Sequence, residues 1–309
     1  MGGDWEGDHG HASGLPHRRC HQQPPVRPPV TTGRSLIGVD FSSAPTTRKP
    51  ITVAVGRLTG TRRPVYRLET IRELPSQAAF EQLLAEPGDW IGGFDLPFGQ
   101  PRELIEHEGW PTDWAAFVRF FCSQSREDLR LVFRRWCAAR PVGDKFAWRK
   151  TDRPAGSSPA MRWTNPPVAW MMHAGIGRML AAGLAFPAHE PPRHRSQRRR
   201  IALEAYPGFT ARRVVRGSYK SDQAASQTTD RRQRRRQILA AVIAGTAGLG
   251  VRLETSPTWR RRMLADGRGD LLDAVLCSLQ AGHATLLPRF GLPHQLDPLE
   301  GWIASVPAQ

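Results

Sequence analysis

The stretch R-S-L-I-G-V-D-F-S-S-A-P at residues 34–45 decides the predicted fold. Its apolar residues Leu36, Ile37 and Val39 form a short run between a glycine and a proline, which is typical of a buried strand. The strand ends on Asp40, and small hydroxyl residues follow. An unpaired carboxylate in such a place destabilises a fold, so it commonly faces a cation or a metal ion. Alternatively, Asp40 only caps the turn that follows.

The composition is that of a globular protein with a real core. The chain has 309 residues, 39% of them hydrophobic, which is enough for one large domain or two small ones. We find no run long enough for a membrane span and no signal peptide. The four cysteines are scattered without a C-x-x-C pair, which argues against a disulfide framework or a zinc site. These features predict a cytoplasmic protein with no membrane partner.

The charge is strongly positive. The formal net charge is +16 and the sequence pI is about 11.1, with arginine supplying most of the basic residues. A field of this sign attracts polyanions, so nucleic acid is the leading candidate partner. A generally solvated basic surface is the alternative interpretation.

In the first half of the chain, the sequence predicts a disordered tail at residues 1–33 followed by the strands of a sheet. Two β-rich runs, at 51–58 and 65–74, follow the Asp40 strand and complete an antiparallel meander. Ser76 is expected to cap a short helix at 77–86. A fourth strand at 90–94 leads into F-D-L-P-F-G, so Asp95 is a second acid at the end of a buried strand. An Asx-turn at Asp95 is the alternative.

A helical insertion is predicted at about residues 100–195. Aromatic and basic residues alternate over 134–170, a pattern that suits phosphates and unstacked bases. Tryptophan in the core with arginine snorkelling beside it is the competing interpretation. A fifth strand at 201–206 then carries Glu204, and helices are expected at 209–216 and 231–247. The glycine-rich residues 245–250 follow a helix, so we interpret them as a helix stop and not as a phosphate loop.

The last predicted element is an apolar helix at residues 269–287. Asp270 and Asp273 are three residues apart and therefore project from one face of it. Two like charges there repel unless something positive lies between them. The alternative is that Asp270 caps the helix and Asp273 complements its dipole.

This order of elements resembles the RNase H fold, whose acids converge from the first strand, the fourth strand and the final helix. The resemblance implies an α/β fold with a mixed five-stranded sheet, flanking helices and a helical insertion over residues 34–309. The D-x-x-D-A of the last helix is similar to that of the Holliday-junction resolvases in the same superfamily. Resolvase-like members commonly act as dimers, so a homodimer is a further expectation.

A closer resemblance is to the predicted nuclease family labelled domain of unknown function 429. It extends from about residue 34 to the end of the chain, and it depends on the order and spacing of short motifs. These motifs are G-V-D-F-S at 38–42, G-F-D-L-P-F-G at 93–99, E-A-Y-P at 204–207, Y-K at 219–220, G-D-L-L-D-A at 269–274 and E-G-W-I at 300–303.

The resemblance implies a metal-dependent nuclease that hydrolyses phosphodiester bonds with Mg²⁺ or Mn²⁺. Two ions are expected, one to activate the attacking water and one to stabilise the leaving oxygen. The predicted ligands are four aspartates, with Asp40 bridging the ions and the other three divided between them: Asp40, Asp95, Asp270 and Asp273. Glu204 is expected to be a further ligand or a positioning base, and Lys220 either steadies charge on the phosphate or is an ordinary surface lysine.

Two rival functions fit parts of the pattern. An actin-like or sugar-kinase-like phosphotransferase shares the core fold and also begins with a G-x-D strand. That class needs two such domains, and residues 34–309 offer only one meander. The other rival is a nucleic-acid-binding protein that uses the fold without catalysis, and its binding would not depend on the acids.

Overall fold

Six strands form one mixed sheet in the computed structural model, which describes residues 1–3, 35–60, 62–190 and 199–308. The disordered tail predicted at residues 1–33 therefore lies, except for its first three residues, outside the described residues. The strands are β1 (Ser35–Asp40), β2 (Ile51–Thr59), β3 (Val65–Leu74), β4 (Trp90–Asp95), β5 (Arg200–Glu204) and β6 (Arg252–Glu254).

The strand order is β5-β4-β1-β2-β3-β6. β1, β2 and β3 pair antiparallel, which confirms the predicted meander, whereas β4 is parallel to β1 and to β5. The prediction of five strands is wrong by one, because β6 pairs parallel with β3 at the edge of the sheet. β6 has only three residues, too few for the alternation of polar and apolar residues that identifies a strand in a sequence.

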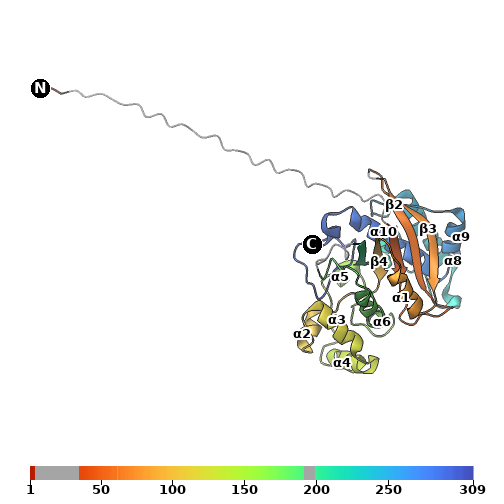
Figure 1. Ribbon diagram of the computed structural model, residues 1–309, viewed down its shortest axis with the longest axis horizontal. Coiled ribbons are helices and arrows are strands. Elements are labelled where there is room, and N and C mark those ends of the chain that lie inside the picture. The colour runs from red at the N-terminus through yellow and green to blue at the C-terminus, as the bar shows by residue number, and fades with distance from the viewer. Residues whose placement is uncertain (4–34, 61, 191–198, 309) are drawn as a thin grey trace.

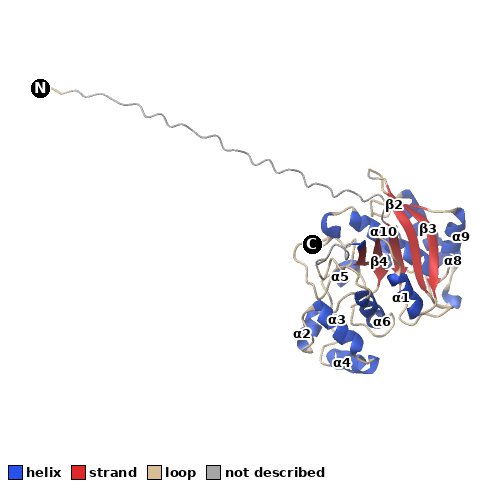
Figure 2. Ribbon diagram, in the orientation of Figure 1, coloured by secondary structure: helices blue, strands red, loops and turns tan. Residues whose placement is uncertain are grey.

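Helices cover both faces of the sheet (Figures 1 and 2). Ser76 caps the first one, its side chain accepting a hydrogen bond from Ala79 N at 3.1 Å, and Gly245 ends the eighth in the left-handed conformation. Both signals were predicted from the sequence. The helices are α1 (Gln77–Ala85), α2 (Arg102–His107), α3 (Trp114–Ser123), α4 (Arg126–Ala138), α5 (Asp152–Ala155), α6 (Val168–Ala181), α7 (Pro207–Val214), α8 (Thr229–Ala244), α9 (Pro257–Ala265) and α10 (Asp270–Thr285).

The central strands are buried on both faces, which explains their nearly continuous apolar runs. Ile37, Val39 and Phe94 belong to a core that includes α1, α3, α4 and α6. Leu36 and Ile91 point the other way, into a core shared with α8 and α10. Helices α2 to α6 all lie between β4 and β5 in sequence, and Figure 1 shows α2, α3 and α4 gathered at one end of the molecule, away from α8 and α9.

Two glycines allow α10 to lie directly against β1 and β4. A Cβ atom on Gly38 would stand 2.0 Å from the carbonyl oxygen of Ala274, and one on Gly93 would stand 2.3 Å from that of Cys277. No side chain fits into such a gap, so the backbone of the helix touches the backbone of the strands. Each glycine precedes a strand-ending aspartate by two residues, Asp40 on β1 and Asp95 on β4.

Two tryptophans of the basic segment are core residues, and Phe146 and Trp163 pack against the core, whereas Trp148 is half-buried outside it; this favours the core interpretation over a stacking surface. Trp136 is 1% exposed and Trp170 is 7% exposed. Arginine side chains lie over their rings, with the Arg140 guanidinium 3.1 Å from the ring centre of Trp136. The alternative, tryptophan in the core with arginine snorkelling over it, is the one the structure supports. Among the helices of the described part of the chain, none is both long and apolar enough to cross a membrane.

Candidate functional site

Asp40 and Asp95 lie side by side at the ends of two neighbouring parallel strands. They are register partners, as are Gly38 and Gly93 two residues before them. Side chains alternate along a strand, so both carboxyl groups are on the face of the sheet that α10 covers. In open α/β sheets the carboxyl ends of parallel strands are where ligands bind.

The first turn of α10 brings two more acids to the same edge. The helix begins at Asp270, with Gly269 at the N-cap position, so Asp270 is not the cap that one interpretation of the sequence offered. Asp273 is 0% exposed and Asp270 is 9% exposed. Asp40, Asp95 and Asp270 line one cleft, and the negative charges of Asp95, Asp270 and Asp273 raise the pKa of Asp40, so the four predicted carboxylates lie in one cluster.

Lys220 and Tyr219 hold Asp273. The Tyr219 hydroxyl donates a hydrogen bond to Asp273 Oδ1, and the Lys220 ammonium forms an ion pair with Oδ2. Both carboxylate oxygens of Asp273 therefore have donors from the protein. The Lys220 side chain is 39% exposed, so it reaches from the buried acid to the solvent.

Fewer hydrogen-bond donors reach the carboxylates of Asp270, Asp40 and Asp95. The nearest cation to Asp270 is Arg268, whose Nε lies 3.4 Å from Oδ2, and this oxygen has no hydrogen bond among the described residues. In the same part of the chain, no group donates a hydrogen bond to the carboxylates of Asp40 or Asp95. Three carboxylates in the cluster therefore have oxygens open to a further ligand.

The cluster disfavours its own negative charge. Burial raises the pKa of Asp95 to about 7 and that of Asp270 to about 6, and it raises the pKa of Asp40 well above its usual range. The neighbouring acids add to the upward shift of each pKa, whereas Lys220 opposes it. A bound cation would favour the ionised carboxylates.

Glu204 has different partners from the four aspartates. It is the register partner of Phe94, the residue before Asp95, so its side chain points to the opposite face of the sheet. Arg149 binds both of its oxygens, at 2.6 and 2.8 Å, and Phe98 N donates to Oε2 at 2.9 Å. With its oxygens occupied in this way, Glu204 fixes the loop that follows Asp95.

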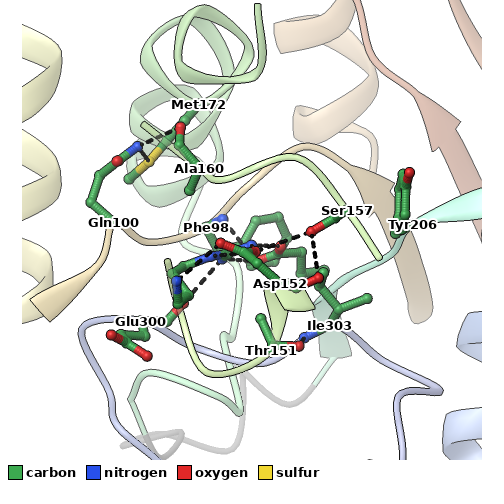
Figure 3. Close-up of polar contacts among 12 residues, drawn as sticks. Phe98, Gln100, Thr151, Asp152, Ser157, Ala160, Met172, Tyr206, Glu300 and Ile303 are labelled. Atoms are coloured by element: carbon green, nitrogen blue, oxygen red, sulfur yellow. Dashed lines mark hydrogen bonds and ion pairs between the residues drawn. The ribbon is translucent and has the colours of Figure 1, made fainter. Parts of the chain in front are cut away.

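Arg149 is the centre of a buried polar network that the sequence did not reveal. It is 2% exposed, and its Nη2 also donates to Asp152 Oδ1 at 2.8 Å. Figure 3 shows Ser157 beside Asp152, with its hydroxyl 3.2 Å from Oδ1. Ile303 N donates to Thr151 Oγ1 at 3.1 Å in the same network, which ties the C-terminal segment to α5 (Figure 3).

A cleft of about 580 Å³ opens over these groups. Asp40, Asp95, Lys220 and Asp270 line it, together with Arg268. The ends of β1, β4 and β5, the start of α6 and the loop before α10 form its walls. A second hollow, of about 780 Å³, lies beside α1 and α6 and has none of the predicted site residues in its lining.

The arrangement fits a metal ion with few protein ligands. In the described ranges, no three acidic, histidine or cysteine side chains are placed so that they could hold one ion. The adjacent carboxylates of Asp40 and Asp95 are nevertheless open to the cleft. Mg²⁺ commonly takes one or two carboxylates and completes its shell with water and substrate phosphate. This donor set suits that mode of binding.

Sequence reasoning found the four aspartates but missed Arg149, Tyr219 and Arg268 as members of the site. Tyr219 stands in the Y-K motif at residues 219–220, but the motif gave no sign of its contact with Asp273. We compared the chain with models of protein families, with curated proteins and with solved structures, and none of these comparisons found a match. The resemblance to the family of domain of unknown function 429 therefore stays a prediction.

Proposed function

We propose that this protein is a metal-dependent nuclease of the RNase H-like type, which hydrolyses phosphodiester bonds in nucleic acid. The observation that carries the proposal is the pair Asp40 and Asp95, side by side on adjacent parallel strands and open to a cleft. The first turn of α10 adds two acids to this pair. Acids from the first strand, the fourth strand and the last long helix are what the sequence resemblance implies.

The sheet also supports the proposal. Its strands β1 to β3 form the expected meander, and β4 and β5 extend the other side of the sheet in parallel. The described residues contain one such sheet, whereas the phosphotransferase rival requires two domains of this kind. The nuclease is thus favoured over that rival.

In this proposal Asp40 and Asp95 would hold a Mg²⁺ or Mn²⁺ ion. When bound, such an ion lowers the pKa of a water molecule and offsets the charge of the reacting phosphate. Glu204 acts through position, because it fixes Phe98 and with it the loop after Asp95. Lys220 reaches the cleft with a positive charge beside the acids, where a phosphate group would bind.

The substrate is a polyanion, in keeping with the net charge of +16. A nucleic-acid phosphate brings the oxygens that a metal ion with only two protein carboxylates still needs. Mononucleotides offer the same chemistry but do not use the positive field of the whole molecule.

The test compares the wild-type protein with Asp40→Asn. We expect the wild type to cleave single-stranded or branched nucleic acid only when Mg²⁺ or Mn²⁺ is present. Asp40→Asn is expected to lose cleavage while it keeps its fold and its salt-dependent binding. Asp144→Asn, a change at an exposed aspartate, is the matched control and should cleave like the wild type. If Asp40→Asn cleaves normally, the site is wrong; if wild type binds nucleic acid but never cleaves it, the non-catalytic alternative replaces the nuclease.

A further inference from the structure

Lys220 brings a fixed positive charge into the acid cluster. Its ammonium pairs with Asp273, and its charge also acts on Asp40, Asp95 and Asp270. The sequence resemblance implied two metal ions among these four aspartates. In the structure, a cation belonging to the protein already lies among them.

Asp273 is the anchor for this cation. It is 0% exposed, and Tyr219 and Lys220 between them occupy both of its oxygens. Asp273 is also absent from the lining of the cleft, whereas Asp40, Asp95 and Asp270 line it. A metal ion at Asp273 would have to enter a buried place and compete there with two protein donors. Asp273 therefore holds Lys220 and is less open to a metal ion than the other three aspartates.

Two cations of the protein pair with members of the cluster. Lys220 pairs with Asp273, and Arg268 lies at ion-pair distance from Asp270. In the described part of the chain, Asp40 and Asp95 have no such partner, although they stand side by side and line the cleft. When ionised, these two carboxylates match the charge of one divalent ion.

A second observation points to a ligand next to the aspartates on the strands. Asp270 is nine-tenths buried and lines the cleft, yet its Oδ2 accepts no hydrogen bond in the described part of the chain. Arg268 lies at an ion-pair distance of 3.4 Å from this oxygen. A buried acceptor without a donor destabilises the fold until a ligand or its water supplies one.

We propose that the Lys220 ammonium takes the place of a second metal ion, so that the site binds a single divalent ion at Asp40 and Asp95 with Asp270 beside it. This inference rests on the proposed function. It differs from what the sequence resemblance implies in the number of ions and in the role of Asp273, which holds the lysine. Lys220 is then a permanent part of the charge that faces the substrate phosphate.

The test is a titration with Mn²⁺, followed by calorimetry and by electron paramagnetic resonance of the bound ion. Wild type is expected to bind one Mn²⁺ per chain, and Asp40→Asn to lose that binding at least tenfold. Lys220→Met removes the internal cation and should bind two ions per chain, whereas Lys220→Arg should still bind one. Lys145→Met, a change at an exposed lysine, is the matched control and should also bind one.

The outcomes separate the inference from the proposed function. Two ions in wild type, both lost in Asp40→Asn, would overturn the inference and leave the metal-dependent nuclease standing. One ion in both wild type and Lys220→Met, with equal affinity, would also overturn it. Binding of no ion by wild type, even with single-stranded nucleic acid added, would overturn the proposed function itself. If Lys220→Met does not fold without metal, recovery of its folding by Mn²⁺ but not by Na⁺ supports the inference, and failure to recover overturns it.

Discussion

Replacing Gly38 with alanine is expected to push α10 away from the sheet. The added Cβ would stand 2.0 Å from the carbonyl oxygen of Ala274, and 2.3 Å from the backbone nitrogen of Ser278. Carbon and oxygen atoms in close contact are about 3.3 Å apart, so the helix must retreat by about 1 Å. Both atoms belong to the helix backbone and cannot rotate away.

The expected loss of stability follows from this geometry. Overpacking a core costs about 1–3 kcal/mol, and a clash with backbone atoms belongs at the upper end, so we expect a loss of about 3 kcal/mol. The shift also disturbs the hydrogen bond from Tyr66 to Ser278 Oγ, which is 3.1 Å long. Because the first turn of α10 carries Asp270 and Asp273, Mn²⁺ binding should weaken in the same variant.

Urea unfolding followed by circular dichroism measures the effect. The matched control is Gly282→Ala on the same helix, where the new Cβ meets side-chain methyl groups and no backbone, the nearest being Leu36 Cδ1 at 3.1 Å. Alanine is favoured over glycine within a helix by about 0.8–1.0 kcal/mol, so this variant should stay within about 1 kcal/mol of wild type. If Gly38→Ala is as stable as Gly282→Ala, the close contact between α10 and β1 does not control the packing.

Three further outcomes are expected. Burial lowers the pKa of His189 to about 3, from an ordinary value near 6.5. Below pH 6.5 this histidine therefore binds a proton in the unfolded chain but stays neutral in the folded chain. Lowering the pH from 7 to 5 should therefore reduce the unfolding free energy of wild type by about 2 kcal/mol through this residue. Urea unfolding of His189→Gln at the same two pH values should not show this loss. Arg149→Met leaves Glu204 and Asp152 buried without their cation, which should lower the unfolding free energy by about 3–5 kcal/mol in thermal or urea unfolding. The double variant that also carries Glu204→Gln should lose less stability than the two single variants added together. Millimolar ATP with Mg²⁺ should leave the melting temperature unchanged, and a clear shift would favour the phosphotransferase.

The sheet and the four aspartates could be predicted because their signals are local. The apolar runs before Asp40 and Asp95 identify two buried strands, and the spacing of Asp270 and Asp273 places both on one helical face. The orientation of Glu204 could not be predicted, because it depends on the register between β4 and β5. The three residues of β5 before Glu204 are all apolar, so no alternation indicates which face of the sheet Glu204 occupies.

Contacts between distant residues were equally hidden. Lys220 and Asp273 are 53 residues apart, and the loop that carries the lysine has no periodicity that places it against α10. Arg149 stands in a segment rich in arginine and tryptophan, where a phosphate-binding surface and a packed core share the same composition. The burial of Arg149 and its pairing with Glu204, like the burial of Trp136, show which interpretation holds for this segment.

The close contact between α10 and the strands has a consequence for the motions of the site. Nearly all residues of α10 are buried, and the helix touches β1 and β4 without intervening side chains. Elements of this kind exchange their amide hydrogens only when the whole molecule opens. The aspartates are thus attached to the part of the protein whose amide hydrogens should exchange most slowly, and not to a loop that opens locally. Heat inactivation should therefore coincide with global unfolding instead of preceding it.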